Sequence, residues 1–433
     1  MREMKESGFK WIGEIPTSWT VIKSKYVIDQ NDGGMWGNDP TNTENDKKVI
    51  RSTEQTIDGK WVIEDPAIRC LSGNNLSFYR ISKNDLLITK SSGSPKHIGK
   101  TTLADGRFET EEFYYSNFIQ RIKVKNVLPK FMWYIYNSRI SREQFVFRQN
   151  STSGIGNINS EDIANIYIPY PSTSEQQHIA DYLDRKCGEI DSVMADLQEQ
   201  IDKLEQYKRS VISETVTKGL NQKAPMKDSG ISWVGMIPAN WEVDKLKYHL
   251  HRTEQRNPGN KQVLSLYREY GVIPKDSRDD NHNVTSEDTS KYKYVVPGDF
   301  VINKMKAWQG SVGVSNYEGI VSPAYYVYKF TDDRFNKRYF HYLLRGCYKD
   351  EFRRLSGGIR EGQWDLSSFA LDNTYIILPT KLEQEEIAKY LDNKCAEIES
   401  IIADKKQQLE VVENYKKSLI YEYVTGKKEV VDE

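Results

Sequence analysis

The stretch SEQQHIADYLDRKCGEIDSVMAD, residues 174–196, returns as LEQEEIAKYLDNKCAEIESIIAD at residues 382–404. Neither copy contains proline, and both are rich in Glu, Leu, Ile and Ala, a composition that favours α-helix. In the first copy the pattern continues to Lys218, where Gly219 offers a stop, and Thr173 or Ser174 can cap the start. Because a helix rises about 1.5 Å per residue, we expect two matching helices, each about 65 Å long.

Apolar residues recur in both copies at alternating steps of four and three, the heptad pattern of a coiled coil. In the first copy they are Leu183, Cys187, Ile190, Met194, Leu197, Ile201 and Leu204. In the second they are Leu391, Cys395, Ile398, Ile402, Leu409 and Val412, with Lys405 interrupting the seam. Such a stripe also fits a helix packed on a globular core. Since the register matches in two copies, we expect the helices to pair with each other, antiparallel if a pseudo-two-fold axis crosses them.

A second block is also repeated. KESGFKWIGEIPTSWTVIKSKY at residues 5–26 returns as KDSGISWVGMIPANWEVDKLKY at residues 227–248, with 12 of 22 positions identical. We call residues 5–26 and 227–248 the two start blocks. The chain therefore reads as start block, insert and helix, written twice. This predicts an α+β fold with two α/β domains in pseudo-two-fold arrangement (residues 1–170 and 221–378), separated by two long helices (171–220 and 379–428) that form an antiparallel coiled coil.

The two inserts share little sequence but show the same kinds of element. Short β-branched and aromatic runs at residues 85–89, 118–124, 299–303 and 324–330 are bounded by turn residues, which indicates strands. Residues 128–145 and 333–355 have helical spacing. Each of these helices precedes a Ser/Gly loop, at residues 151–157 and 356–363. We therefore expect one mixed α/β architecture in both inserts.

Composition bounds the class of protein. The chain has 433 residues, of which 38% are hydrophobic and 28% charged, so packed cores are expected. No apolar run approaches the ~18 residues of a membrane helix, and the N-terminus lacks a signal peptide, so we expect no membrane contact and a cytoplasmic location. The four cysteines lie far apart without a CxxC pair, which indicates reduced thiols and no zinc site.

The net charge of −1 is an average over the whole chain, so it does not exclude a nucleic-acid partner for part of it. Residues 75–150 hold 13 Lys and Arg against 6 Asp and Glu, and residues 291–362 hold 13 against 7. Acidic residues gather in other loops and in the helices. The second half of each insert is therefore basic, with interleaved aromatics and Gly/Ser loops that suit a phosphate backbone.

The candidate DNA-contacting residues come from loops of the two inserts. In the second insert the loop after a predicted strand supplies Lys304, Lys306, Trp308 and Gln309, and the Ser/Gly loop supplies Arg360 and Gln363. In the first insert the candidates are Trp36, Arg51, Lys90, Ser92, Lys96, Lys100 and Asn157. Any one of these could be a solvated lysine or a core aromatic. The matching placement in both inserts favours DNA contact for the set.

Motifs of catalysis are missing. The sequence has no GxxxxGK[ST], GxGxxG after a strand, HExxH or GxSxG, and no amino-methyltransferase or restriction-nuclease constellation. His249 and His251 lack a third ligand nearby and are interpreted as surface strand residues. A non-catalytic role with no cofactor is the default. Two alternatives stay open: a self-sufficient DNA methyltransferase or nuclease, and a coiled-coil scaffold that does not bind DNA.

The start blocks and the EQ..IA.YLD.KC.EI helices resemble the specificity subunit of type I restriction-modification systems. The resemblance spans essentially the whole chain. It implies a non-enzymatic subunit in which two target-recognition domains each read one half of a split sequence in double-stranded DNA. It also implies a coiled coil that sets the spacing and docks two modification (methyltransferase) subunits. S-adenosylmethionine, ATP and Mg would then belong to those subunits and to separate restriction (ATP-dependent endonuclease) subunits.

Two unlike inserts on one frame predict two unlike half-sites. On one face of the duplex these would lie about one helical turn, ~34 Å, apart. Since adenine methylation requires the base to leave the stack, we expect the complex to bend or open the DNA.

Overall fold

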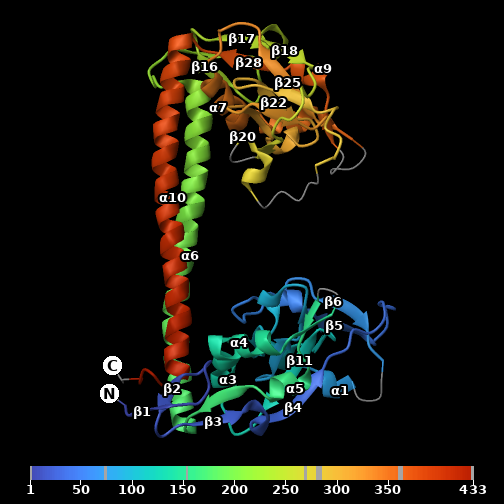
Figure 1. Cartoon of the computed structure of the whole chain (residues 1–433), viewed down its shortest axis with the longest axis vertical. Helices are drawn as coiled ribbons and strands as arrows, with labels where there is room; N and C mark the ends of the chain where they lie inside the picture. The colour runs from blue at the N-terminus through green and yellow to red at the C-terminus, as the bar shows by residue number, and fades with distance from the viewer. Residues whose placement is uncertain are drawn as a thin grey trace. The chain divides into compact units, whose positions relative to one another are not determined.

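A computed structural model describes residues 2–72, 76–152, 155–267, 271–278, 285–358 and 364–430 (Figure 1). The chain divides into two compact units, which we call unit 1 (Met1–Leu197 and Gln407–Glu433) and unit 2 (Gln198–Lys406). The two long helices are α6 (Thr173–Lys218) and α10 (Lys381–Val424), and each contributes one part to both units. The predicted order of start block, insert and helix is confirmed in both halves of the chain.

The first insert is built around an antiparallel sheet of strand order β4-β11-β7-β9, beside a smaller sheet of order β10-β5-β6. The strands of unit 1 are β1 (Met4–Glu6), β2 (Glu14–Pro16), β3 (Thr20–Lys23), β4 (Ile28–Gly33), β5 (Asp46–Ile50), β6 (Ala67–Cys70), β7 (Leu86–Thr89), β8 (Ser91–Ser92), β9 (Thr101–Leu103), β10 (Phe113–Tyr115), β11 (Ile119–Val124), β12 (Asn150–Thr152), β13 (Ile155–Asn157) and β14 (Tyr167–Tyr170). Its short helices are α1 (Leu76–Tyr79), α2 (Arg107–Thr110), α3 (Pro129–Asn137), α4 (Arg139–Arg148) and α5 (Ser160–Ala164).

The second insert repeats the central sheet in the order β18-β25-β22-β23, although its other strands pair differently. The strands of unit 2 are β15 (Met226–Asp228), β16 (Met236–Pro238), β17 (Glu242–Lys245), β18 (Leu250–Thr253), β19 (Leu264–Tyr267), β20 (Gly271–Pro274), β21 (Lys293–Val295), β22 (Phe300–Asn303), β23 (Val312–Val314), β24 (Gly319–Val321), β25 (Tyr325–Phe330), β26 (Ser356–Gly357), β27 (Asp365–Leu366) and β28 (Tyr375–Leu378). Its short helices are α7 (Lys337–Cys347), α8 (Lys349–Leu355) and α9 (Ser368–Asp372).

Each predicted insert helix is broken in two. Residues 128–145 form α3 and α4 because Ser138 adopts an extended backbone between them, and its hydroxyl donates to the Ile135 carbonyl at 2.7 Å. Residues 333–355 form α7 and α8, which meet at Tyr348. The break lets both helices bury aromatic residues in one core. The apolar spacing therefore continues across the break, and the sequence alone predicted one helix.

Each start block closes a core on its long helix. Trp19 and Trp241 are fully buried, and their indole nitrogens donate to Glu175 and Glu383 at 3.1 and 3.2 Å. The same carboxylates cap the long helices: Glu175 accepts from the Ser172 hydroxyl, and Glu383 accepts from the Thr380 hydroxyl. This is the reciprocal capping box, so the cap of α6 is Ser172, one residue before the predicted Thr173 or Ser174.

A buried glutamine joins each long helix to its insert. Gln176 accepts from the Leu128 backbone nitrogen at 2.8 Å and donates to the Pro171 carbonyl at 3.0 Å. Gln384 makes the matching pair of bonds to the Asn336 nitrogen and the Pro379 carbonyl. Both amides are fully buried. Since an unsatisfied buried polar group costs ~1–3 kcal/mol, these bonds fix the entry of α3 and α7 onto the helices.

The far end of each long helix returns to a start block. α6 is followed by Gly219 at φ +72°, against Trp241, and α10 is followed by Gly426 at φ +71°, against Pro16 and Trp19. A Cβ at Gly426 would lie 2.6 Å from Pro16, so glycine is required both by its backbone and by its neighbour. Unit 1 is thus closed by residues from both ends of the chain.

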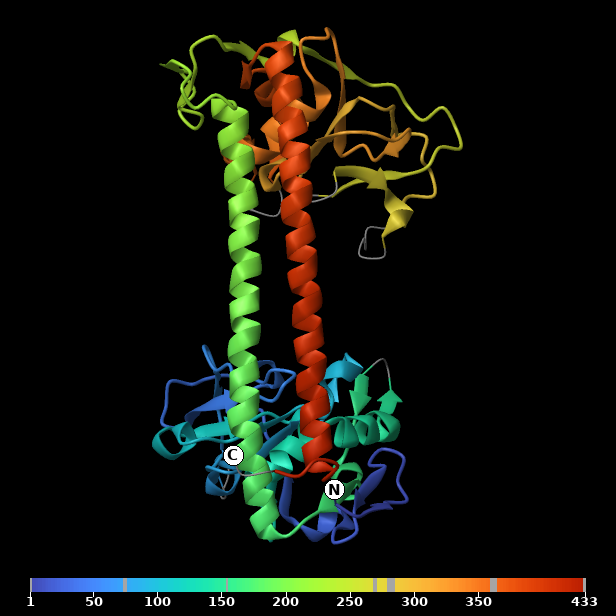
Figure 2. The same ribbon diagram turned by 90° about the vertical axis from the view of Figure 1, so that its left-hand side faces the viewer.

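The predicted seam is confirmed in each unit, where α6 and α10 run antiparallel (Figure 2). In unit 1, Tyr182 packs on Tyr423 while Lys416 reaches Asp191 at 2.5 Å. The pKa of the Asp191 carboxyl is held below its usual value, because bonds from Lys416 and Lys60 outweigh the opposing effect of burial. The seam residues Leu183, Cys187 and Leu391 are buried with the domain cores rather than in an isolated coiled coil.

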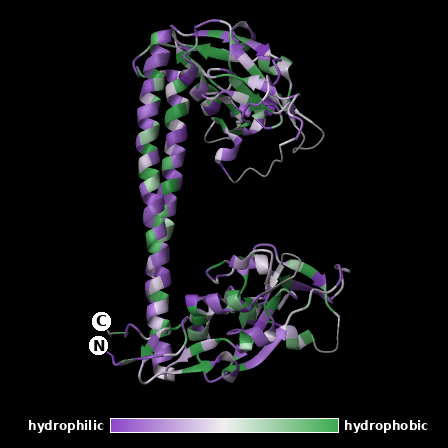
Figure 3. Ribbon diagram, viewed as in Figure 1, coloured by the Kyte–Doolittle hydropathy of each residue, from purple (hydrophilic) through white to green (hydrophobic). Residues whose placement is uncertain are grey.

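In unit 2 the seam is narrow. Ile201, Leu204, Ile398 and Ile402 form its apolar cluster. The predicted interruption at Lys405 is accommodated because its ammonium reaches out of the seam to the Gln200 side chain at 2.5 Å. Lys208, the α6 counterpart of Lys416 in α10, pairs with Glu399. Hydrophobic residues accordingly form a stripe along otherwise polar helices (Figure 3).

A fragment of residues 226–433 keeps the second insert and α10 but loses the part of α6 that covers Ile398 and Ile402. We expect it to self-associate in sedimentation experiments, because its seam is left without a partner. Ile398→Glu should weaken the association, whereas Ser400→Glu on the exposed face should not. A clean monomer would contradict helix pairing.

Candidate nucleic-acid interface

Lys90 follows β7 in the first insert and lies against Gly33 at the end of the edge strand β4. Its side chain is half-buried, and burial lowers the pKa of its ammonium. The next residues form β8, which pairs with β13 so that Ser91 donates to Asn157 at 2.6 Å. The structure therefore brings Ser92 and Asn157 onto one small sheet, with Lys90 directly before it.

The lysines of the next turn separate into two kinds. Lys96 is exposed, and its carbonyl accepts a bond from Arg142. Lys100 is only 4% exposed, and its ammonium donates to the carbonyls of Ser52 and Gln55 at 2.6 and 2.7 Å. Burial, reinforced by the charge of Arg142, lowers the pKa of Lys100 to about 8. Its assignment as a DNA contact is wrong, because it is a structural tie that no phosphate can reach.

Two further predicted residues of the first insert are engaged by neighbours. The Arg51 guanidinium donates to Glu54 at 2.7 Å and to the Asp65 carbonyl at 2.8 Å, and the bond to Glu54 raises its pKa. The Trp36 ring carries the Arg69 guanidinium 4.8 Å from its centroid. Sequence reasoning missed Arg69, which is half-buried in β6 and meets Trp36 from 33 residues further along the chain.

In the second insert the predicted loop begins with a neutralised lysine. Lys304 donates to Asp365 on β27 at 3.1 Å, and the Leu366 nitrogen donates to the Lys304 carbonyl at 3.0 Å. Lys306 is exposed. Asp365 comes from 61 residues further along the chain, which is why the pattern INKMK alone did not reveal the pair. Arg360 and Gln363 lie outside the described residues.

Trp308 is part of an aromatic pair. Its indole nitrogen donates to the Met305 carbonyl at 3.1 Å, and its ring meets Trp364 edge to face at 5.6 Å. The Arg353 guanidinium lies 6.0 Å from the Trp364 centroid, and Gln309 is half-buried in the same turn. Trp364 and Arg353, missed in the sequence, thus extend the predicted loop into a half-exposed surface of aromatic and cationic groups.

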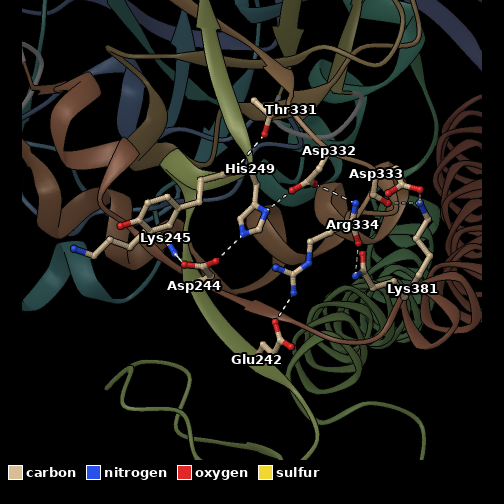
Figure 4. Close-up of polar contacts among 11 residues, drawn as sticks. Glu242, Asp244, Lys245, His249, Thr331, Asp332, Asp333, Arg334 and Lys381 are labelled. Carbon is tan, nitrogen blue, oxygen red and sulfur yellow. Dashed lines mark hydrogen bonds and ion pairs between the residues drawn. The ribbon is translucent and has the colours of Figure 1, made fainter.

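The HxH pair separates into one exposed and one buried residue. His251 is exposed on β18, as predicted. His249 is 2% exposed, and its ring nitrogens lie 3.1 Å from Asp244 and 3.0 Å from Asp332, with Phe335 at its edge (Figure 4). The interpretation of His249 as a surface residue is therefore wrong. The first copy has Val27 at this place, so the contacts of this histidine with two carboxylates belong to the second domain alone.

A groove of about 1410 Å³ lies within unit 1, between the first insert and the helices. Lys60 crosses it to reach Asp191 at 2.7 Å. Among the described residues no group of three or more His, Cys, Asp or Glu side chains is placed to hold a metal ion. Within the same residues, no helix has the length and apolar content needed to cross a bilayer.

Two unlike inserts, each with a basic second half, on one duplicated helical frame define a bipartite recognition protein. The chain belongs to the family of the type I restriction modification DNA specificity domain, whose model matches residues 16–203 and 239–411. It is a specificity subunit, the non-catalytic recognition component of such systems. The alternatives of a self-sufficient enzyme and of an unrelated scaffold are not favoured.

Three relatives cover between 80% and 98% of the chain. The putative type I restriction enzyme MjaX specificity subunit of Methanocaldococcus jannaschii is 24% identical over 98% of this chain and 97% of its own length. The MjaVIII specificity subunit of the same organism is 25% identical over 80% of each chain. A solved chain from a study of complex assembly and conformational transition of the type I R-M system shares the fold, with TM-score 0.69, 14% identity and coverage of 96% and 99% of the two chains.

Replacing Lys100 with Met should lower the free energy of unfolding by ~1–3 kcal/mol, because two buried carbonyls lose their donor. The folded-state pKa of Lys100 lies below that of the unfolded chain, so the native protein releases this proton first as pH rises. Wild-type stability relative to Lys100→Met should therefore increase between pH 8 and 10.5. Urea unfolding at several pH values measures both effects, and a flat difference would contradict the assignment.

Lys306→Ala should weaken DNA binding more than Lys304→Ala, because Asp365 already neutralises Lys304. The plot of log affinity against log salt should lose about one unit of slope for Lys306→Ala. Fluorescence anisotropy with a labelled duplex measures this. Equal losses for the two variants would contradict the role of the ion pair.

Proposed function

We propose that each insert binds one half of an asymmetric, bipartite sequence in double-stranded DNA. The observation that carries this is the contrast between frame and insert. The frame repeats contact by contact, from Trp19 and Trp241 to Gln176 and Gln384. The inserts instead present different loop chemistry: serines and Asn157 beside Lys90 in one, and a tryptophan pair beside Lys306 in the other. A repeated frame with unlike reading surfaces suits two unlike half-sites.

The helix pair would set the spacing of the half-sites and dock two modification subunits, with restriction subunits joining the assembly. Long exposed faces of α6 and α10 remain outside the seam, including Val193 and Val411. The name of the solved relative refers to complex assembly, which supports the same role here. S-adenosylmethionine, ATP and Mg would be bound by those partners, and the complex would act in the cytoplasm.

Exchange of residues 27–173 for the insert of another family member should change one half of the methylated sequence and leave the other half unchanged. The reason is that residues 5–26 and residues 174–218 of α6, which hold the insert, are retained. Methylation-sensitive sequencing of host DNA, with the modification subunit co-expressed, reads the outcome. The reciprocal exchange of residues 249–379 is the matched control and should change only the other half.

An unchanged motif would overturn the proposal, as would a change in both halves. The enzymatic alternative has its own test: the purified chain alone, incubated with DNA and labelled S-adenosylmethionine, should transfer no label.

A further inference from the structure

The two start blocks end in the same exposed group of side chains. The short 3-10 helices η1 (Ser24–Tyr26) and η4 (Leu246–Tyr248) follow the strand after the buried tryptophan, which is β3 in unit 1 and β17 in unit 2. They precede β4 and β18, the edge strands of the main sheets. We define the start-block patch as two lysines and two tyrosines in each unit. Its members are Lys23, Lys25, Tyr26 and Tyr167 in unit 1, and Lys245, Lys247, Tyr248 and Tyr375 in unit 2.

The contacts inside the patch are repeated in detail. In unit 1 the Lys25 ammonium lies 5.2 Å from the Tyr26 ring centroid, and that of Lys23 lies 5.6 Å from Tyr167. In unit 2 the corresponding distances are 5.3 Å for Lys247 over Tyr248 and 5.1 Å for Lys245 over Tyr375.

One lysine of each patch also reaches a matched asparagine. Lys23 donates to Asn165 at 3.3 Å, and Lys247 donates to Asn373 at 3.2 Å. The ammonium groups are therefore held in place at the surface, while each keeps donors directed to solvent.

The two tyrosines of the start blocks lie outside both cores, whereas Tyr167 packs partly against the first core. Tyr26 is 62% exposed and Tyr248 is 60% exposed. The residue between the two lysines has diverged according to local need: Ser24 bonds to Tyr136, whereas Leu246 packs in the second core. Exposed cation–π pairs contribute only about 0.5–1 kcal/mol. Folding alone therefore gives little reason for two diverged copies to keep the same exposed Lys and Tyr residues, so we look for one external chemistry that both copies meet.

The patch is positive because neighbouring acids are occupied. Asp29 pairs with Lys125, and Asp244 faces His249. Within the residues described here, no ion pair joins an acid to Lys23, Lys25, Lys245 or Lys247. Two lysines held over tyrosine rings suit phosphodiester oxygens, which look the same whatever the base sequence.

We propose that the start-block patches bind the DNA phosphate backbone without sequence preference, one patch beside each half-site. This rests on the proposed function, and it assigns the repeated frame a direct role in DNA affinity. The specificity of each half-site would then come from the insert, and a sequence-independent share of its affinity from the start block.

The path from reading loop to patch follows the same elements in both units, although it ends on Lys23 in unit 1 and on Lys247, the counterpart of Lys25, in unit 2. In unit 1 the Lys90 carbonyl accepts from Ile158, α5 follows, and Asn165 meets Lys23. In unit 2 the Lys304 carbonyl accepts from Leu366, α9 follows, and Asn373 meets Lys247.

The length of the edge strand β4 gives the approximate distance between the Lys90 loop and the start-block patch in unit 1. The strand runs from beside η1 to Gly33, against Lys90. Six residues at ~3.3 Å each span about 20 Å, or about six base pairs at ~3.4 Å per pair. The contacted phosphates should accordingly lie about six base pairs from the bases nearest Lys90.

The test compares two variants of the full chain, each assembled with its modification subunits. The patch variant has four lysine substitutions and the control variant has two. The patch variant carries Lys23→Gln, Lys25→Gln, Lys245→Gln and Lys247→Gln. The control variant carries Lys5→Gln and Lys227→Gln, the remaining identical lysine pair of the start blocks, on the β1/β2 and β15/β16 hairpins. Anisotropy with target and non-target duplexes is measured from 50 to 300 mM NaCl.

The patch variant should lose about 3 to 4 units of salt slope and bind both duplexes about tenfold or more weakly, with the same preference for the target. For each lysine replaced, the control variant should change the salt slope far less than the patch variant does. Ethylation interference on the wild-type complex should mark phosphates about six base pairs outside the recognised bases. An unchanged slope in the patch variant would overturn the inference, as would failure of the variant to assemble with the modification subunits, which would assign the patch to the partner protein. If the wild-type complex itself showed no preference for its target, the proposed function would fail instead.

Discussion

The junction between a buried tryptophan and the ends of the long helices holds each unit together. Trp19 bonds to Glu175 at the start of α6 and packs against Gly426 just after α10. Trp241 makes the matching junction with Glu383 and with Gly219 after α6. Each core is therefore closed by segments far apart in sequence, Trp19 and Gly426 in unit 1 and Gly219 and Glu383 in unit 2. The heptad seam follows from this constraint, because two helices anchored at opposite ends must run antiparallel beside each other.

Sequence patterns predicted the parts whose causes are local or repeated. The seam residues, the start blocks and the central strands all appear where expected, since heptad spacing and alternation are written in neighbouring residues. Predictions failed where a distant segment decided the outcome. Lys100 is buried by carbonyls about 45 residues earlier, at Ser52 and Gln55, and His249 is enclosed by Asp332, 83 residues later. Lys304 is neutralised by Asp365 for the same reason.

The net charge of the chain does not describe how its individual cations are used. The net charge of −1 combines basic insert halves with acidic helices and loops. Many of the insert cations are internally paired, such as Arg51 with Glu54, and contribute to stability rather than to a DNA surface. Within the part of the chain that the structure describes, the cations that we assign to DNA are Lys90, Lys96, Lys306 and the lysines of the start-block patches. In our account the inserts supply the sequence specificity of DNA binding, and the start-block patches supply part of its affinity.

The central claim is that one chain specifies two unlike half-sites. Methylated-base sequencing of DNA from a host that expresses the wild-type chain with its modification subunit tests this directly. The account predicts a single motif made of two different short sequences separated by a fixed number of unspecified base pairs, absent when the chain is omitted. A continuous or palindromic motif, or one that persists without the chain, would contradict it.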